Sequence, residues 1–432
     1  MSQSTGPSGP PPDALPVRRP ALPRRLVRYA ERAVDPGHRA RGRVRRWGAP
    51  ASRPGDDERD HGLQLRWSAC YAPSASLYLD QHGAVRACCQ NTGHLLGDLR
   101  HQSLREVWEG APARELREAL ARDDLSKGCE FCAWQRTEVA PTSWFSGSFD
   151  HAPVGRRLHP RWPRQLELAL SNTCNLRCTM CNGEWSSAIR AQREHLPPLP
   201  AVYGDAFFDE LAEFLPHLEE VHLLGGEPFL GREPLRVLDQ LCTLDRAPHV
   251  IITTNATRWD DRVRTIARRL RPAIVVSLDG ADRETYEAIR VGAAFDEVLA
   301  NLDAFRATVG PRHVSIAHCL MVGNWHRFPE LLALAEGRGL DVVVNTVRFP
   351  ADHSLHQLPA DRLAEVVAEL EQRGPAVEAT LTGSRLRAWH DQVGALAARA
   401  RSERWPEALG TPPAVADVPV ALGRRGPAPR PT

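Results

Sequence analysis

Residues 165–181 read QLELALSNTCNLRCTMC, a short apolar strand followed directly by three cysteines within eight residues. Cys174, Cys178 and Cys181 have C-x3-C-x2-C spacing. Thiolates spaced in this way can bind three irons of a cubane iron–sulfur cluster and leave the fourth iron without a protein ligand. Catalytic metal sites keep such an open position, whereas structural sites are closed. The stretch therefore predicts a reactive cluster at the end of a strand.

From Gln165 onward the sequence alternates between β-branched strands and amphipathic helices. The expected strands cover residues 165–170, 219–225, 249–254, 273–278, 313–321 and 341–347. The expected helices cover residues 205–215, 234–244, 258–270, 283–289, 295–307 and 328–336. This alternation predicts an α/β fold with a parallel sheet. Because six units are too few for the usual eight-stranded barrel, we expect an open, partial (β/α)6 TIM-like barrel with its function at the carboxyl ends of the strands.

The strands after the cysteine loop end in short polar motifs: GGEP at residues 225–228, TTN at 253–255, SLDG at 277–280 and MVGN at 321–324. With the cysteine loop, these motifs resemble the radical S-adenosylmethionine (radical SAM) superfamily over roughly residues 163–350. The resemblance implies that Cys174, Cys178 and Cys181 are the catalytic ligands of a 4Fe–4S cluster. It also implies that the cluster cleaves S-adenosylmethionine to a 5′-deoxyadenosyl radical, which abstracts hydrogen from the substrate.

The same resemblance assigns cofactor contacts to the strand ends. The expected S-adenosylmethionine-binding residues are Gly225, Gly226, Glu227, Asn255, Ser277, Asp279 and Arg290. The two glycines would let the backbone approach the methionine amino group, and the glutamate would pair with that ammonium. The other residues would bind the carboxylate or the ribose. Each has a plainer interpretation as a turn or cap residue, since Asp279-Gly280 is a good turn dipeptide on its own.

A second set of cysteines lies upstream of this core. Cys70, Gly83 and Cys88 form a C-x12-G-x4-C pattern around an expected hairpin, and Cys129 and Cys132 form a C-x2-C pair after an amphipathic helical segment. The pattern resembles the twitch domain, the shorter relative of the SPASM domain, and implies an auxiliary 4Fe–4S cluster with these four cysteines as ligands. The resemblance is imperfect, because the module normally follows the radical core. We expect one auxiliary cluster, since the further cysteines of a full SPASM domain are absent from the sequence.

Several cysteine assignments stay open. Cys89 adjoins Cys88 and is the alternative ligand, although the G-x4-C spacing favours Cys88. Four cysteines that include a C-x2-C pair also suit a structural zinc site. Cys242 and Cys319 stand alone, and we interpret both as packed core thiols. The alternative for Cys319, which lies in the fifth strand, is that it faces the barrel interior.

The expected organisation combines these units with two terminal extensions. We expect a disordered, basic N-terminal extension at 1–60, the twitch/SPASM-like domain at 61–150 and the radical SAM core at 160–350. A C-terminal helical segment at 351–405 and a disordered tail at 406–432 are expected to follow. The extension is interpreted as a solvated tail or as an arm for nucleic acid or a partner. No apolar run reaches the roughly 18–20 residues of a membrane span, and we expect a cytoplasmic protein in which ten cysteines serve metal or redox chemistry.

The leading function is a radical SAM oxidoreductase that acts on a carbohydrate-like or aminocyclitol-like small molecule. The auxiliary cluster would accept the electron of the substrate radical, and a donor such as ferredoxin or flavodoxin would reduce the first cluster. The alternative is modification of a ribosomally made peptide by cross-linking, thioether formation or epimerisation. A non-catalytic iron–sulfur or zinc scaffold that binds nucleic acid is a third class, which the intact cysteine loop and GGEP motif argue against.

Overall fold

The protein is described by a computed structural model that covers residues 68–138, 144–150, 158–347 and 350–401. Its strands form one nine-stranded sheet in the order β3-β2-β1-β4-β5-β6-β7-β8-β9. The expected extension at residues 1–60 and the tail at 406–432 lie outside the described residues.

Six parallel strands form the radical core, each next to its predecessor in the sheet. They are β4 (Gln165–Leu168), β5 (Glu220–Leu223), β6 (His249–Thr254), β7 (Ala273–Ser277), β8 (Val314–Leu320) and β9 (Asp341–Thr346). All six lie within the predicted strand ranges. The linear strand order confirms the predicted α/β class and the open parallel sheet of a partial barrel.

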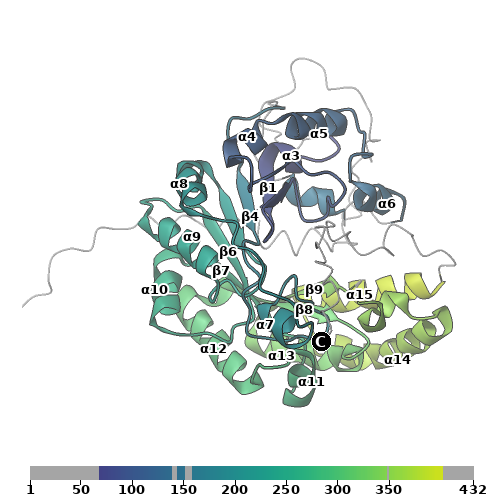
Figure 1. Ribbon diagram of the computed structural model, residues 1–432. Helices are drawn as coiled ribbons and strands as arrows, with labels where there is room; N and C mark the ends of the chain where they lie inside the picture. The colour runs from purple at the N-terminus through teal and green to yellow at the C-terminus, as the bar shows by residue number, and fades with distance from the viewer. Residues whose placement is uncertain (1–67, 139–143, 151–157, 348–349, 402–432) are drawn as a thin grey trace, which may run out of the picture.

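Helices connect these strands and cover one face of the sheet (Figure 1). They are α7 (Ser187–Gln192), α8 (Asp205–Phe214), α9 (Arg232–Thr243), α10 (Asp261–Leu270), α11 (Arg283–Ile289), α12 (Phe295–Val309) and α13 (Phe328–Arg338). Aspartates cap two of them: Asp260 accepts a hydrogen bond from the amide of Val263, and Asp282 from that of Thr285. Such caps satisfy amides that lack a partner inside the helix, which explains where α10 and α11 begin.

The two faces of the sheet differ in character. Alternate residues such as Leu166, Val221 and Ile252 are fully buried under the helices. The residues between them are partly exposed on the opposite face, which we call the inner face. The register places Glu167 beside His222 and His222 beside Ile251 on this inner face. The inner face therefore carries the polar side chains of Glu167 and His222 beside the apolar side chain of Ile251.

The upstream cysteine unit continues the same sheet. Its elements are α3 (Ala72–Ala75), β1 (Ser76–Leu79), β2 (Ala84–Arg86), β3 (Gly97–Asp98), α4 (Leu104–Trp108), α5 (Ala111–Ala121), α6 (Glu130–Glu138) and the 3-10 helix η2 (Phe145–Phe149). The predicted hairpin is β1 and β2, which pair antiparallel. Strand β1 also pairs parallel with β4, so the auxiliary unit adds to the barrel sheet, a connection that the sequence did not predict.

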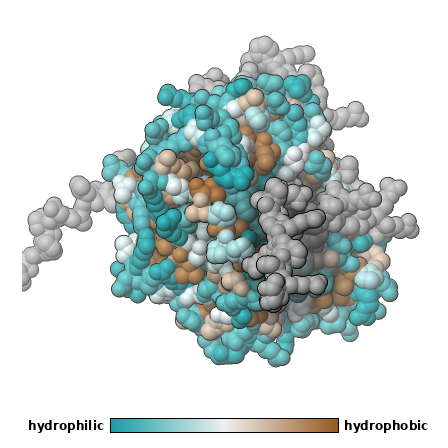
Figure 2. Space-filling model, in the orientation of Figure 1, coloured by the Kyte–Doolittle hydropathy of each residue, from teal (hydrophilic) through white to brown (hydrophobic). Residues whose placement is uncertain are grey.

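Two long helices, α14 (Ala360–Glu378) and α15 (Gly383–Arg401), follow the last strand and pack against each other. Helix α15 also packs against β9. The face in Figure 2 is largely hydrophilic, with small separated hydrophobic areas. In the described part of the chain, no helix has the length and apolar character needed to cross a membrane.

Candidate active site

The three cysteines of the first set lie in the loop that follows β4. The backbone amides of Arg177 and Thr179 donate to Val291 and Ile289, which fixes the loop against the segment after α11. Burial raises the pKa of the Cys181 thiol to about 12, and the nearby charges of Cys178 and Cys174 add to the effect. The three thiols are therefore close enough to repel one another as thiolates. A positively charged group among them would relieve that repulsion, which fits an iron–sulfur cluster.

The GGEP loop packs directly on the cysteine loop. A Cβ added at Gly226 would lie 2.4 Å from the carbonyl oxygen of Thr173, the residue before Cys174. Gly225 has a φ of 103°, which an L side chain rarely adopts. The glycines thus permit a close approach between two loops, a role that the sequence interpretation did not include.

Glu227 is buried and held by three donors. Its Oε1 accepts from the Phe229 amide at 3.1 Å and from the Thr254 hydroxyl at 2.8 Å, and its Oε2 accepts from the Asn255 amide at 2.7 Å. The carboxylate therefore ties the GGEP loop to the end of β6. Burial still raises its pKa, although these three hydrogen bonds oppose that rise.

The next strand end places an amide beside the first cysteine. The Asn255 Nδ2 donates to Asn175 Oδ1 at 3.0 Å and lies 3.8 Å from the Cys174 sulfur. Ser277 ends β7 on the inner face, beside Ala317 of β8. The predicted strand-end residues are thus brought to the edge of the sheet that carries the cysteine loop.

Asp279 and Arg290 form a buried ion pair at the same edge. The Arg290 Nε donates to Asp279 Oδ2 at 2.7 Å, and the Cys319 amide donates to Asp279 Oδ1 at 2.7 Å. The Arg290 Nη1 lies 3.9 Å from the Cys178 sulfur. Burial raises the pKa of Cys178 and the charge of Arg290 lowers it, so this guanidinium favours the thiolate. Cys319 was interpreted as a core thiol, but its partly exposed side chain lies within electrostatic range of Cys178.

The second set of cysteines also converges. Burial raises the pKa of Cys70, and the charges of Cys88, Cys132 and Cys129 raise it further. Cys88 is buried and its charge acts on Cys70, whereas Cys89 is exposed. The assignment of Cys88 as the ligand stays a prediction. Four thiols that repel one another as thiolates again fit a cationic cluster.

Asn91 supports this second set and was missed by the sequence analysis. It is buried, its Nδ2 donates to the Lys127 carbonyl at 3.0 Å, and the same nitrogen lies 3.5 Å from the Cys129 sulfur. In the described segments, no three or more His, Cys, Asp or Glu side chains are arranged to hold a single metal ion. The cysteines of a cubane each bind a different iron, so a cluster does not require that arrangement.

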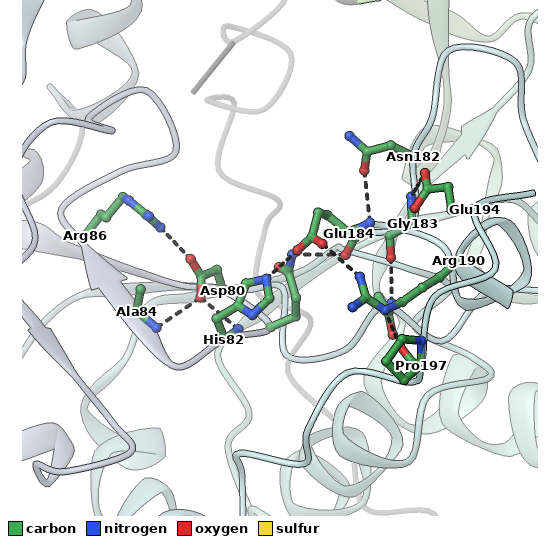
Figure 3. Close-up of polar contacts among 12 residues, drawn as sticks. Asp80, His82, Ala84, Arg86, Asn182, Gly183, Glu184, Arg190, Glu194 and Pro197 are labelled. Carbon is green, nitrogen blue, oxygen red and sulfur yellow. Dashed lines mark hydrogen bonds and ion pairs between the residues drawn. The ribbon is translucent and has the colours of Figure 1, made fainter. Parts of the chain in front are cut away.

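A polar bridge joins the auxiliary hairpin to the chain just beyond the first cysteine set (Figure 3). His82 Nε2 lies 2.5 Å from Glu184 Oε2, and Arg190 Nη1 donates to Glu184 Oε1 at 2.9 Å. The side-chain Nε2 of Gln81 donates to the backbone carbonyl of Glu184 at 3.0 Å. A cavity of about 340 Å³ borders this bridge and is lined in part by Gln81, Asn172 and Arg190. No sequence motif predicts the bridge or the cavity.

Comparison with known proteins agrees with this geometry. The model of the radical SAM superfamily matches residues 168–335, and that of an iron–sulfur cluster-binding domain, SPASM, matches residues 70–133. The chain belongs to the radical SAM superfamily, and its SPASM-type domain precedes the core, as predicted. It therefore uses a 4Fe–4S cluster with S-adenosylmethionine and an auxiliary iron–sulfur cluster.

Individual relatives match part of the chain. A GTP 3′,8-cyclase from Ectopseudomonas mendocina is 30% identical over 55% of this chain and 69% of its own length. A GTP 3′,8-cyclase from Erythrobacter litoralis is 28% identical over 41% of this chain and 52% of its own. Among solved structures, anSMEcpe with bound AdoMet is 15% identical and covers 48% of this chain and 59% of its own, with a TM-score of 0.35. SuiB from Streptococcus suis bound to precursor peptide SuiA is 17% identical, with coverage of 50% and 47% and a TM-score of 0.35.

Proposed function

We propose that this radical SAM enzyme is an oxidoreductase that converts a hydroxyl-bearing carbon of a small carbohydrate-like or aminocyclitol-like molecule to a carbonyl. The observation that supports the proposal is the second thiol set, which converges at the edge of the barrel sheet. A cluster bound by four cysteines has no open iron for substrate, and its simplest use is to accept an electron. We assign its ligands as Cys70, Cys88, Cys129 and Cys132.

The residues around the first set would bind and orient the reacting groups. When bound, the cluster and S-adenosylmethionine supply a 5′-deoxyadenosyl radical. Cys174, Cys178 and Cys181 would hold the cluster, and Arg290 keeps a positive charge beside the Cys178 sulfur. We propose that the strand ends contact S-adenosylmethionine through Gly225, Gly226, Glu227, Asn255, Ser277, Asp279 and Arg290. The donor of the first electron would be a small protein such as ferredoxin or flavodoxin.

Anaerobic reconstitution tests the proposal. We expect roughly eight irons per chain, formation of 5′-deoxyadenosine, and a ketone when an aminocyclitol or polyol is supplied. Cys129→Ser should lose ketone formation together with about four irons but retain some cleavage of S-adenosylmethionine. Zinc in place of the auxiliary irons, or ketone formation by the Cys129→Ser variant at the wild-type rate, would contradict the proposal.

A second candidate is a redox-neutral cyclisation, because the relatives with the highest similarity reported above are named GTP 3′,8-cyclase. The inner face carries the carboxyl groups of Glu167 and Glu220, which would repel a triphosphate. Incubation with GTP under reducing conditions decides between the two: consumption of GTP with a cyclic product would favour this candidate over alcohol oxidation.

A further inference from the structure

Among the residues that the structure describes, the carboxylate of Glu167 on the inner face has no cationic partner. Glu167 lies in the middle of β4, and its Oε1 accepts a single hydrogen bond, from the Gln165 Nε2 at 3.3 Å. In the part of the chain that the structure describes, no Arg, Lys or His forms an ion pair with it. The other carboxylates near the site differ: Asp279 pairs with Arg290, and Glu184 pairs with Arg190 and lies beside His82. Glu227 forms no ion pair among the described residues either, but three donors hold its carboxylate. Glu167, which accepts one hydrogen bond from a neutral amide, is therefore compensated less than these other acids.

The groups around Glu167 come from β1 and β5, which flank β4, and from β2, which lies beyond β1. Tyr78 on β1 and His222 on β5 are its direct register partners, and Glu220 lies two residues before His222. Burial lowers the pKa of His222 to about 4, so this imidazole is neutral near pH 7 and supplies no positive charge. Arg86 on β2 faces Tyr78, but its guanidinium pairs with Asp80 at 2.6 Å. No neighbour therefore neutralises the carboxylate.

The position of Glu167 relates it to both thiol sets. Strand β4 runs directly into the loop that carries the first set, beginning at Cys174. On its other side, β4 pairs with β1 of the auxiliary hairpin, and β2 of that hairpin leads to Cys88. Burial raises the pKa of Cys88 to about 12, and the charge of Glu167 contributes to that rise, so the two groups are within electrostatic range. Glu167 thus lies on the strand that connects the radical loop to the auxiliary site.

We propose that Glu167 is the catalytic base that removes the hydroxyl proton of the substrate during oxidation, and that the same carboxylate binds an amino or hydroxyl group of the substrate. This inference rests on the proposed function. The hydrogen atom of the substrate C–H bond goes to the 5′-deoxyadenosyl radical, which leaves a carbon radical that carries a hydroxyl group. The O–H bond then breaks, its proton goes to Glu167, its electron pair and the unpaired electron form the C=O bond, and the surplus electron goes to the auxiliary iron–sulfur cluster.

The chemical environment suits this role. A general base works best when its pKa lies near the working pH. Burial raises the pKa of Glu167 to about 7, and the charge of Glu220 adds to that rise. A carboxylate without a cation also favours a substrate that carries an ammonium group, which agrees with an aminocyclitol more than with an anionic sugar phosphate or nucleotide.

The test uses the reconstituted full chain, with streptamine and scyllo-inositol as probes. The Glu167→Gln variant keeps the size of the side chain, and Glu213→Gln on the exposed side of α8 is the matched control. We expect Glu167→Gln to retain its iron content and its formation of 5′-deoxyadenosine without a probe, but to form ketone about 100-fold more slowly than the control. The ratio of 5′-deoxyadenosine to ketone should therefore be higher for Glu167→Gln than for the control.

The outcomes separate this inference from the proposed function. If wild-type protein oxidises neither probe, the proposed function fails, and the assignment of Glu167 fails with it. If wild type and Glu167→Gln oxidise a probe equally well, the function stands and the assignment of Glu167 is wrong. An infrared pH titration gives a readout that does not depend on turnover: a carboxyl band that titrates near pH 7 should be present in wild type and absent from Glu167→Gln. Identical spectra for the two proteins would overturn the proposal.

Discussion

Replacement of Glu167 by glutamine should stabilise the folded protein at alkaline pH and leave its stability unchanged at acidic pH. The carboxyl group is held in the sheet with one neutral hydrogen-bond partner, so its ionisation is unfavourable in the folded state. Glutamine has nearly the same shape and can still accept the hydrogen bond from Gln165. The substitution therefore removes the charge while the packing is preserved.

The magnitude follows from the pKa of the group. Burial, with a contribution from Glu220, raises the pKa of Glu167 from 4.5 to about 7. The folded state binds the proton of Glu167 more tightly than the unfolded state does. The free energy of unfolding of the wild type therefore falls as pH rises from about 4.5 to 7, and the full destabilisation is present above about pH 7. A pKa difference of one corresponds to about 1.4 kcal/mol, which gives an upper limit of roughly 3 kcal/mol. Since the side chain is partly exposed, we expect about 1–3 kcal/mol.

The assay compares melting temperatures of wild type, Glu167→Gln and the control Glu213→Gln at equal iron content. In a chain of this size, about 1–3 kcal/mol corresponds to a rise of about 1–3 °C in melting temperature for Glu167→Gln at pH 8. At pH 4.5 the difference should fall to about 0.4 kcal/mol, because Glu167 is protonated in the folded state and about half protonated in the unfolded state. A variant that is destabilised at pH 8, or whose advantage is the same at both pH values, would refute the reasoning.

Three further outcomes test the two thiol sets and the buried ion pair. Cys174→Ala should abolish 5′-deoxyadenosine formation in a chromatographic assay, and cleavage at the native rate would show that the first cluster is wrongly assigned. Cys129→Ser should lower the iron content by roughly four per chain, whereas Cys89→Ser should leave it unchanged; equal losses would make Cys89 a ligand. Arg290→Met should cost about 3–5 kcal/mol in urea unfolding because it leaves Asp279 charged and unpaired. The added change Asp279→Asn should recover much of that loss, and no recovery would contradict the pairing.

The sequence predicted the radical core well because its signals are local. Buried parallel strands produce continuous apolar runs, and each strand end carries a short motif, so the order of the strands and their motifs can be read along the chain. The first cysteine set is confined to eight residues, and its spacing already defines its chemistry. The prediction that Cys88 rather than Cys89 is a ligand also rests on a local signal, the spacing from Gly83, and the iron contents of the two variants test it.

Contacts between distant segments could not be predicted in this way. Glu167 appears in QLELAL as an ordinary polar residue of an alternating strand, and only the register shows that it lacks a cation. The partners of Glu227 come from a strand about 28 residues further on, so its role in joining two loops has no sequence pattern. The bridge between His82 and Glu184 spans 102 residues and is equally hidden.

The pairing of β1 with β4 explains how an auxiliary unit can precede the core. An open barrel leaves the first core strand with unpaired backbone groups at its edge, which is a site for aggregation. Strand β1 covers that edge, and its parallel direction requires the long crossover that residues 80–164 provide. The sheet then ends in β3, which is only two residues long and offers little edge to another chain. The backbone hydrogen bonds between β1 and β4 consequently attach the unit that carries the auxiliary thiols to the barrel. A fixed distance between the two thiol sets would suit the proposed electron transfer, because the rate of electron transfer varies with the distance between donor and acceptor.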